Sequence, residues 1–460
     1  MFFQTISTPG LSLNTYLIGS TITKCCAVID PSRQIAPYLA AAQNAGLKIT
    51  HIIETHVHAD FVSGALELKQ ELEGHPVIYC SGMGGEEWIP NYADKIVHDG
   101  DCIQLDFLRL QALHTPGHSP EHLSWICYDE KRNSDIPWFI FTGDFLLING
   151  IGRPDLLGEE KNKHLTDQLY SSLFEKIQSL PDSLEIFPSH SSGSVCGQSY
   201  GGKNFSTLGY EKLCNPYFQI KPKEEWVEYL TQNFTPYPLH LQKIKQMNLK
   251  GPELLEDLTS LSSEGCVDEV DLEELFILDT RVPQKFADFH IKNALNIPMQ
   301  DSFCQWCSWF VPTDKPLAII TDDHYRDAQI TTQLRLVGFD QPLLFIALSA
   351  RIKSHLKGEV LKMIMPSEAE TSEASIIIDV RSKKEWADGH VAQAHHIELT
   401  EIETVLKKFS FDQPLIMVCR SGMRSSIAAS FLQSKGFQNV SSLHGGMQSW
   451  QSANLVNEKL

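Results

Sequence analysis

The stretch Thr55-His56-Val57-His58-Ala59-Asp60-Phe61 decides how the first half of this sequence is interpreted. It places two histidines and an aspartate within five residues, directly after the apolar run Ile52-Ile53, which is typical of a buried strand. Histidines separated by one residue project their ring nitrogens from a single turn, which suits a metal ion. The stretch therefore predicts a metal-binding loop at the end of a sheet strand.

Three further polar residues occur in the same setting, each where an apolar run ends. They are His118 after Thr115-Pro116-Gly117, Asp144 after Phe141-Thr142-Gly143, and His190 after Phe187-Pro188-Ser189. The surrounding sequence alternates strand-like runs such as Leu13–Ser20 with helix-like runs such as Val62–Leu72. This alternation predicts an α/β domain over residues 1–215, in which the sheet delivers these side chains to one cleft.

Composition narrows the class of protein. A chain of 460 residues is too long for one hydrophobic core, so several domains are expected. A formal net charge of −19 argues against nucleic-acid and anionic membrane partners. No apolar run reaches the roughly 18 residues of a membrane span, and the first residues lack a secretion signal. The eleven cysteines form no regular framework, which favours reduced thiols and a cytoplasmic location.

The second half of the chain repeats itself with a period close to 100 residues. Ile277–Arg281 matches Ile377–Arg381, and Phe286–Ile291 matches Trp386–Val391. Two tandem copies of one small α/β domain are the simplest interpretation. The predicted parts are a capping or linking segment over 216–255, a first copy over 256–363 and a second copy over 364–460, with acidic Ser367–Ser375 as the linker between the copies.

The second copy contains a loop that predicts anion binding. Apolar Pro414–Val418 runs into Cys419-Arg420-Ser421-Gly422-Met423-Arg424, and a helix-like segment follows over Ile427–Gln433. Backbone N–H groups of such a loop and the helix N-terminus form an anion cradle, and the two arginines favour a nucleophilic thiolate. The Cys-x4-Arg spacing is one residue shorter than the Cys-x5-Arg of protein phosphatases. The smaller pocket favours carrying one sulfur atom as a persulfide, whereas the alternative is a buried cysteine beside surface arginines.

This segment resembles the rhodanese (sulfurtransferase) family. The resemblance rests on the loop, on Asp379-Val380-Arg381, on Gly389-His390-Val391 and on Leu443-His444-Gly445-Gly446-Met447. It implies that Cys419 accepts a sulfur atom, with two arginines as catalytic partners and three loop residues around the substrate. The arginines are Arg420 and Arg424, and the residues around the substrate are Ser421, Gly422 and Met423.

The first copy departs from this pattern. Thr321 stands at the position of Cys419, and Asp322 replaces Arg420. A threonine hydroxyl without a neighbouring base is a poor nucleophile, and an aspartate repels an anion. We therefore expect the first copy to be catalytically silent and to serve packing or docking.

The N-terminal motifs resemble those of the metallo-β-lactamase superfamily, whose fold is an αββα sandwich with the metal at one sheet edge. The resemblance implies an α/β chain in which this sandwich is followed by the two rhodanese-like α/β domains. In most members the first motif reads His-x-His-x-Asp-His, and the site holds two zinc ions for hydrolysis. Here Phe61 replaces the last histidine, and a phenyl ring cannot ligate a metal. This departure weighs against a two-zinc hydrolase of the glyoxalase II type.

The candidate ligands that remain resemble those of one branch of the superfamily, the persulfide dioxygenases. Its iron ligands carry over to His56, His118 and Asp144, which implies one Fe(II) per chain, with zinc possible in purified protein. Two imidazoles and one carboxylate with open positions are the arrangement that non-haem Fe(II) oxygenases use. The remaining polar residues are expected to orient ligands and water, or else to form structural hydrogen bonds: His58, Asp60 and His190.

Two further residues carry expectations from the same resemblance. Arg153 lies in a Gly-Arg segment that neighbours the thiol substrate in the family, so it is a candidate partner for a carboxylate of a peptide thiol. The alternative is a surface arginine in a turn. Cys196 lies near the place where fused family members carry a sulfur-handling cysteine, and the alternative is a buried thiol.

Taken whole, the chain resembles fused persulfide dioxygenase–rhodanese proteins of sulfide detoxification. The resemblance implies oxidation of a persulfide, such as glutathione persulfide, by O₂ to sulfite, coupled to a sulfurtransferase that forms or uses thiosulfate. Persulfide, sulfite and thiosulfate are the expected small-molecule partners, and a homo-oligomer is expected. Two alternatives stay open: a zinc-dependent thioester hydrolase with an appended sulfurtransferase, and a non-enzymatic sulfur carrier.

Overall fold

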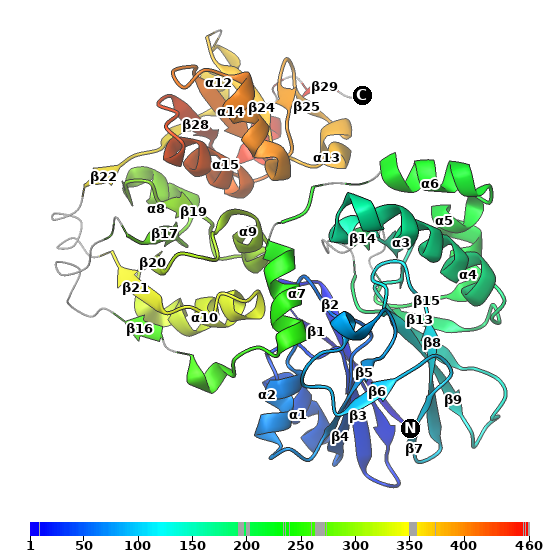
Figure 1. The fold of residues 1–460 in the computed structure, drawn as a ribbon. Helices are drawn as coiled ribbons and strands as arrows, with labels where there is room; N and C mark the ends of the chain where they lie inside the picture. Colours follow the sequence, from blue (N-terminus) through cyan, green and yellow to red (C-terminus); the bar gives the residue numbers. More distant parts are fainter. Residues whose placement is uncertain are drawn as a thin grey trace. The chain divides into compact units, whose positions relative to one another are not determined.

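The computed structural model describes all of residues 1–460 except 9, 192–196, 199–202, 233, 235, 239, 259, 263–271, 273, 349–356, 373, 454, 456 and 459–460. The chain forms two compact units (Figure 1). The first unit comprises Met1–Asp257 with Arg335–Phe339, and the second comprises Leu258–Leu334 with Asp340–Leu460. None of the helices in the described part of the chain has the length and apolar character that a membrane span requires.

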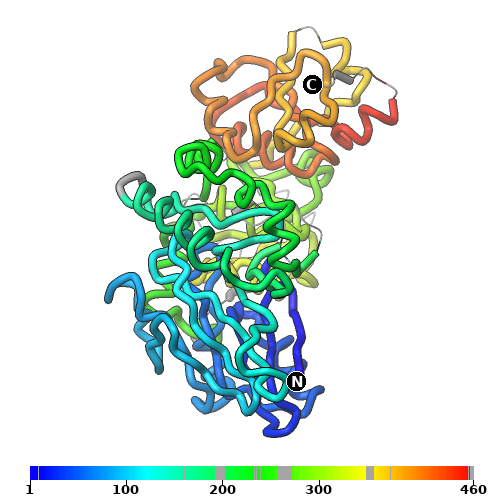
Figure 2. Tube along the Cα trace, turned by 90° about the vertical axis from the view of Figure 1, so that its right-hand side faces the viewer, coloured from blue at the N-terminus to red at the C-terminus, as the bar shows by residue number. Residues whose placement is uncertain are grey.

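The first unit is built on two six-stranded sheets, whose orders are β1-β2-β3-β4-β5-β6 and β15-β13-β10-β9-β8-β7. The strands of the first sheet, blue in Figures 1 and 2, are β1 (Phe2–Thr8), β2 (Leu13–Ser20), β3 (Cys25–Ile29), β4 (Lys48–Ile53), β5 (Val77–Ser81) and β6 (Lys95–Val97). Those of the second are β7 (Cys102–Leu105), β8 (Leu108–His114), β9 (Leu123–Asp129), β10 (Phe139–Gly143), β13 (Glu185–Pro188) and β15 (Ser206–Thr207). A small third sheet joins β11 (Leu146–Leu147), β12 (Gly150–Gly152) and β14 (Gly197–Gln198).

Successive side chains of each strand point to opposite faces of its sheet, so each sheet has a hydrophobic core on both sides. On β2, Ile18 faces a core shared by both sheets, whereas Leu17 faces a second core that includes Ala41 and Leu68 of the helices α1 (Ala36–Asn44) and α2 (Ala65–Glu71). On β10, Phe141 points into the shared core and Ile140 into a third core on the outer face of the second sheet. Two sheets with helices outside both confirm the predicted αββα sandwich.

The segment after the second sheet is helical and packs on that third core. Trp226 and Leu230 of α6 are buried there beside Leu169 of α3. The helices of this region are α3 (Glu159–Ser171), α4 (Leu208–Cys214), α5 (Pro216–Gln219), α6 (Lys223–Gln232) and α7 (His240–Lys250). The segment predicted to cap or link therefore lies, up to Asp257, in the same compact unit as the sandwich.

The second unit contains two copies of one parallel five-stranded sheet, which confirms the repeat. The strand orders are β16-β21-β20-β17-β19 and β23-β28-β27-β24-β26. The first copy has β16 (Ser260–Ser262), β17 (Phe276–Asp279), β18 (His290–Ile291), β19 (Leu295–Asn296), β20 (Leu317–Thr321), β21 (Leu343–Ala347) and β22 (Gly358–Glu359), with α8 (Pro283–Asp288), α9 (Phe303–Phe310) and α10 (Asp327–Leu336). The second has β23 (Lys362–Ile364), β24 (Ile376–Asp379), β25 (His390–Val391), β26 (His395–His396), β27 (Leu415–Val418), β28 (Val440–Leu443) and β29 (Asn457–Glu458), with α12 (Pro366–Glu370), α13 (Lys383–Ala387), α14 (Val405–Lys408), α15 (Met423–Ser434) and α16 (Gly446–Ser452).

The predicted linker at Ser367–Ser375 is wrong in its first half, where α12 forms. Pro366 opens this helix with a backbone angle that suits the first turn, and the Met365 N–H donates to the Glu368 carboxylate at 3.0 Å. The preceding strand β23 already pairs with β28 of the second copy. An acidic composition therefore marks a capped helix here.

Candidate metal centre and sulfurtransferase loop

Three predicted ligand residues of the first unit meet at the ends of their strands. His56 follows β4, His118 follows β8 and Asp144 follows β10. The Nε2 atoms of His56 and His118 lie 3.7 and 3.8 Å from Asp144 Oδ2, and all three atoms fall within 4.8 Å of one another. The sheet edge thus brings together residues separated by up to 88 positions in the sequence (144 − 56).

Neighbouring groups fix which ring nitrogen of each histidine faces the centre. His56 Nδ1 lies 2.9 Å from Thr55 Oγ1, whose own proton is donated to Asp30 Oδ2 at 2.9 Å. The Thr55 oxygen therefore accepts from His56 Nδ1, and the Nε2 lone pair stays free. His118 Nδ1 donates to the Arg153 carbonyl at 3.1 Å with the same result. Metal-binding histidines are oriented by this kind of outer hydrogen bond.

These three residues fit a metal ion. His56 Nε2 and Asp144 Oδ2 are buried, and neither has a hydrogen-bond partner among the residues that the structure describes. Burial lowers the pKa of His56 well below its ordinary value and also lowers the pKa of His118, so both rings are neutral bases. Buried donors without partners are costly unless something binds them. Two neutral imidazoles and one carboxylate suit a divalent transition metal.

The other oxygen of Asp144 leads to a second group of buried charges. His190 Nδ1 donates to Asp144 Oδ1 at 2.6 Å, and His190 Nε2 lies 2.9 Å from Asp60 Oδ2. Burial opposes the charge on His190, but these two carboxylates outweigh burial and raise the pKa of His190 well above its ordinary value. Phe61 is fully buried, with its ring centroid 4.3 Å from that of His58 and 6.3 Å from that of His190. An apolar ring therefore packs against His58 and stands near His190.

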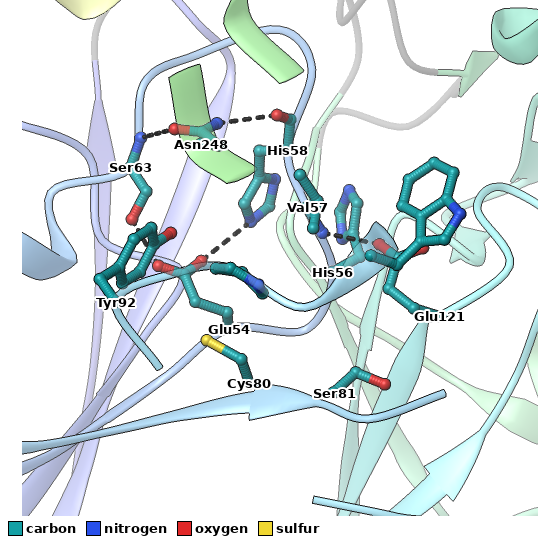
Figure 3. A pocket seen from close by; sticks show the side chains of 12 residues that line it. Glu54, His56, Val57, His58, Ser63, Cys80, Ser81, Tyr92, Glu121 and Asn248 are labelled. Carbon is teal, nitrogen blue, oxygen red and sulfur yellow. Dashed lines mark hydrogen bonds and ion pairs between the residues drawn. The ribbon is translucent and has the colours of Figure 1, made fainter. Parts of the chain in front are cut away.

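His58 turns toward a different pair of carboxylates. Its Nε2 lies 3.1 Å from Asp30 Oδ1. The same atom lies 3.7 Å from Glu54 Oε2, a contact that Figure 3 shows. Burial alone lowers the pKa of His58, but Asp30 and Glu54 outweigh it and raise that pKa to about 9. Burial raises the pKa of Glu54 to about 7. His58 is thus a buried imidazolium within an ion cluster, and the sequence pattern alone does not separate it from His56.

Glu121 and Asn248 hold the loop that carries both histidines. Glu121 Oε1 accepts from the Val57 N–H at 2.8 Å, and Asn248 Nδ2 donates to the His58 carbonyl at 2.8 Å (Figure 3). They line a cavity of about 10 Å³, close to the size of one water molecule. Asn248 belongs to α7, so the segment predicted to cap the domain contacts the ligand loop directly.

Sequence analysis missed His122, although it lies only four residues after His118. Its Nε2 accepts from the Asp144 N–H at 3.2 Å, and its Nδ1 lies 2.9 Å from Thr115 Oγ1. Burial lowers the pKa of His122 to about 3, so it stays neutral and can accept. Gly152 is also required, because a Cβ atom there would stand 1.9 Å from the Asp144 carbonyl.

Arg153 is 7% exposed and so is not a surface turn residue. Its guanidinium donates to both oxygens of Asp155, at 2.7 and 2.6 Å, and lies 5.2 Å from the centroid of the Tyr237 ring. Its carbonyl orients His118, so this residue serves the centre through its backbone. The predicted role of its side chain at a substrate carboxylate stays a prediction, and Cys196 lies outside the described residues.

In the second unit, Cys419 directly follows β27 and precedes α15. It is 1% exposed, and its Sγ accepts from the Gly422 N–H at 3.1 Å. Gly422 has a φ of 98°, a left-handed conformation that favours glycine and aims this N–H at the sulfur. The thiol also lies 3.4 Å from Ser425 Oγ, which accepts from Ser442 Oγ at 2.8 Å. These two serines are contacts that sequence analysis missed.

Arg424 has a partner that the sequence did not predict. Its guanidinium donates to both oxygens of Glu385, each at 2.7 Å. Burial alone raises the pKa of Glu385, but Arg424 outweighs it and lowers that pKa to about 2. Arg420 and Ser421 are exposed, and Met423 opens α15. The roles predicted for these loop residues stay predictions.

The first copy reverses the charges around its loop. Lys285, at the position of Glu385, lies 2.6 Å from Asp322, which stands where Arg420 stands in the second copy. Thr321 is 3% exposed, and within the described part of the chain its hydroxyl has no hydrogen-bond partner. Arg281 and Asp279 nevertheless reproduce the bidentate pair of Arg381 and Asp379. The framework of the domain is retained without a thiol or an anion-binding arginine at the loop start.

Models of two protein families match the N-terminal sandwich and the two C-terminal repeats. The model of the metallo-β-lactamase superfamily matches residues 8–190, and that of the rhodanese-like domain matches residues 256–347 and 359–453. The crystal structure of a metallo-β-lactamase from Staphylococcus aureus subsp. aureus COL is 31% identical, with a TM-score of 0.68, and the match covers 75% of this chain and 99% of that one.

Two curated relatives match the first half. Persulfide dioxygenase ETHE1 of Homo sapiens is 29% identical over 237 residues, which cover 51% of this chain and 83% of the relative. Hydroxyacylglutathione hydrolase of Rhodopseudomonas palustris (strain ATCC BAA-98 / CGA009) is 29% identical over 241 residues, which cover 51% and 80%. The chain therefore belongs to the metallo-β-lactamase superfamily, with an ETHE1-related domain at its N-terminus and two rhodanese-like domains fused after it.

Proposed function

We propose that the N-terminal domain is an iron-dependent persulfide dioxygenase and that the second rhodanese-like domain is a sulfurtransferase. The first reaction is R–S–S⁻ + O₂ + H₂O → R–SH + SO₃²⁻ + H⁺, with glutathione as the proposed thiol carrier. The terminal sulfur is oxidised and dioxygen is reduced. In the second reaction, a persulfide on Cys419 gives its outer sulfur to sulfite, which yields thiosulfate and the free thiolate.

One observation carries the choice of a dioxygenase over a hydrolase. The donor atoms of His56, His118 and Asp144 lie close enough together to hold one ion, whereas Phe61, whose ring centroid lies 6.3 Å from that of His190, offers no donor. A two-metal hydrolase needs nitrogen or oxygen donors at both positions. Asp60, Asp144 and His190 also lie within reach of one ion, but both ring nitrogens of His190 already face the carboxylates of Asp144 and Asp60, at 2.6 and 2.9 Å. The named ETHE1 relatives support the same choice, although the hydroxyacylglutathione hydrolases match at similar identity.

In this proposal the residues of the chain orient the metal ligands and exclude bulk water from the site. When bound, a ferrous ion would supply the reaction with dioxygen that no amino acid side chain can perform. His56, His118 and Asp144 would hold it, while Thr55 and the Arg153 carbonyl keep the two rings oriented. The exposed fractions of the three ligands, 3%, 4% and 0%, keep bulk water away from them.

Two proposals concern the thiol substrate. The Arg153 guanidinium would bind a carboxylate of the peptide thiol in exchange for part of its pairing with Asp155. Cys196 would take part in sulfur handling. Both rest on the family resemblance and on the buried setting of Arg153.

At the second site, the loop supports a persulfide anion. The Gly422 N–H points at the Cys419 sulfur, and the N-terminus of α15 adds a partial positive charge. Sulfite attacks the outer sulfur, the S–S bond breaks, and its electron pair returns to Cys419 as a thiolate. Fusion of the two domains raises the effective concentration of the sulfite that one produces and the other consumes.

Metal analysis followed by oxygen uptake tests the proposal. Protein purified without oxygen is expected to contain about one iron per chain, the number that a single two-His, one-carboxylate set holds. It should consume O₂ and release sulfite when glutathione persulfide is added. Two zinc ions per chain with hydrolysis of a glutathione thioester would instead establish the hydrolase.

A further inference from the structure

The helix that follows Cys419 is covered on nearly every side. Eight consecutive residues of α15, Ser425 to Leu432, are buried. One side of the helix packs on its own sheet through β27 and β28, and another contacts β19 of the first, silent copy. A helix that is buried nearly all round needs more than one partner, so the first copy supplies part of the environment of α15.

Asn296 of β19 makes the polar part of this contact. Its side-chain nitrogen donates to the carbonyls of Asp279 and Arg281, at 3.0 and 2.9 Å. The side-chain oxygen must therefore face α15, where it accepts from Ser426 Oγ at 2.6 Å. The Asn296 N–H donates to Ser430 Oγ at 3.0 Å, one helical turn further along α15. Asn296 is fully buried, so each of these bonds forms without competition from water.

The bond from Ser426 to Asn296 lies one residue along α15 from Ser425, which contacts the sulfur of Cys419. Ser426 belongs to the first turn of α15, and its N–H donates to the Gly422 carbonyl at 3.2 Å. The neighbouring Ser425 contacts the sulfur of Cys419, and Gly422 donates to it. Rotation or translation of this turn would move both contacts together.

The equivalent position of the second copy is used differently. Register with Asp379 places His396 where Asn296 pairs with Asp279. His396 Nε2 lies 2.8 Å from the Arg381 carbonyl, and its ring stacks on Trp386 with the centroids 4.9 Å apart. The bonds from Asn296 to α15 are therefore not a general feature of the repeated domain.

We propose that Asn296 of the silent copy is a positioning residue for sulfur transfer at Cys419, and that this contact is the function of the silent copy. Asn296 holds the first turn of α15 through Ser426, so that the Gly422 N–H and the helix N-terminus stay aimed at the sulfur. The inference rests on the proposed sulfurtransferase activity, because it assigns a role in that reaction.

The test uses full-length protein, with thiosulfate as sulfur donor and cyanide as acceptor. In the first step the thiolate of Cys419 takes the outer sulfur of thiosulfate and releases sulfite, and in the second step cyanide takes that sulfur as thiocyanate. Asn296→Ala and Ser426→Ala should each lower kcat about tenfold with little change in KM, because misalignment of the reacting sulfur costs rate rather than binding. The double variant should be no slower than Asn296→Ala alone.

Alkylation of Cys419 by iodoacetamide at fixed pH supplies a readout that loss of stability alone would not move. We expect slower alkylation in both single variants while their melting temperatures remain above the assay temperature. The matched control is Lys285→Ala, which breaks an exposed ion pair of the same silent copy and should leave both rates unchanged.

Three outcomes decide the matter. Unchanged kcat and unchanged alkylation in Ser426→Ala would overturn the proposal, and this small substitution also decides the case if Asn296→Ala does not fold. Equal losses in Lys285→Ala would overturn it too, because the effect would then be general destabilisation of the silent copy. If wild-type protein forms no thiocyanate, the sulfurtransferase proposal fails, whereas slower alkylation in the variants would still support positioning by Asn296.

Discussion

Replacement of Thr55 by valine tests how the metal centre is built. The substitution keeps the shape of the side chain and removes the hydroxyl that joins His56 Nδ1 to Asp30 Oδ2, each bond being 2.9 Å long. Two buried groups would lose a partner at once, because Thr55 is fully buried. We expect the free energy of unfolding of the metal-free domain to fall by about 1–3 kcal/mol, the cost of leaving buried polar groups unpaired.

The effect on metal affinity is separate from the effect on stability and of similar size. Loss of an outer hydrogen bond to a metal-binding histidine weakens binding by about 10- to 100-fold, which corresponds to about 1.4–2.7 kcal/mol. Affinity can be measured without oxygen by competition for Fe(II) with a chromogenic chelator. Chemical unfolding of the metal-free protein gives the stability term independently.

Thr15→Val is the matched control. Thr15 is also fully buried, and its hydroxyl donates to the Asp30 carbonyl at 2.8 Å and lies 3.1 Å from the Tyr38 hydroxyl, so two bonds are lost again. It touches none of the three ligands, so stability should fall while Fe(II) affinity stays the same. If Thr55→Val folds and binds Fe(II) as tightly as wild type, or if Thr15→Val loses as much affinity, the outer bond to His56 does not orient the ligand.

Three further predictions address the remaining sites. Cys419→Ser should abolish sulfur transfer and leave oxygen uptake intact, and a collapse of uptake in a respirometer would show that the sites depend on each other. Phe61→His should raise the metal content measured by elemental analysis from about one ion per chain toward two, because it adds a donor near His190; an unchanged content would show that the aromatic ring does not block a second ion. The pKa of Glu385 is lowered to about 2 in the folded chain, so its pairing with Arg424 stabilises the fold above the ordinary carboxyl pKa of about 4.3, and this stabilisation is lost as pH falls toward 2. In Glu385→Gln, the melting temperature of the second unit should therefore depend less on pH between about 4.3 and 2 than in wild type. An equally steep fall in melting temperature would contradict the pairing.

The sequence predicted the positions where strands end better than it predicted what the side chains contact. Strand β2 has the bounds Leu13–Ser20 that alternation predicted, and four strand ends carry the expected polar residues. The predicted helix Val62–Leu72 begins later, at Ala65, because Ser63 pairs with Ser32 in an isolated bridge and its N–H donates to Asn248. Local pattern contains no information about such distant partners.

The same limit explains the residues that were missed. Thr55 reaches Asp30, and Arg424 reaches Glu385, across 25 and 39 positions of sequence. His122 accepts from the backbone of Asp144, a contact that no side-chain motif encodes. The residues that can bind a metal are recognisable by type and spacing, whereas those that orient them depend on how the sheets are brought together.

The double coverage of α15 sets a limit on how this protein can be divided. A fragment that begins at the second repeat would expose Phe431, whose ring centroid lies 5.5 Å from that of Phe310 in the first repeat. It would also leave Ser426 and Ser430 without their bonds to Asn296. Such a fragment should aggregate through its exposed apolar surface, and the loop that follows Cys419 should be less well ordered. Studies of the transferase in isolation should therefore retain both repeats, and poor behaviour of a shorter piece would say nothing against its chemistry in the intact chain.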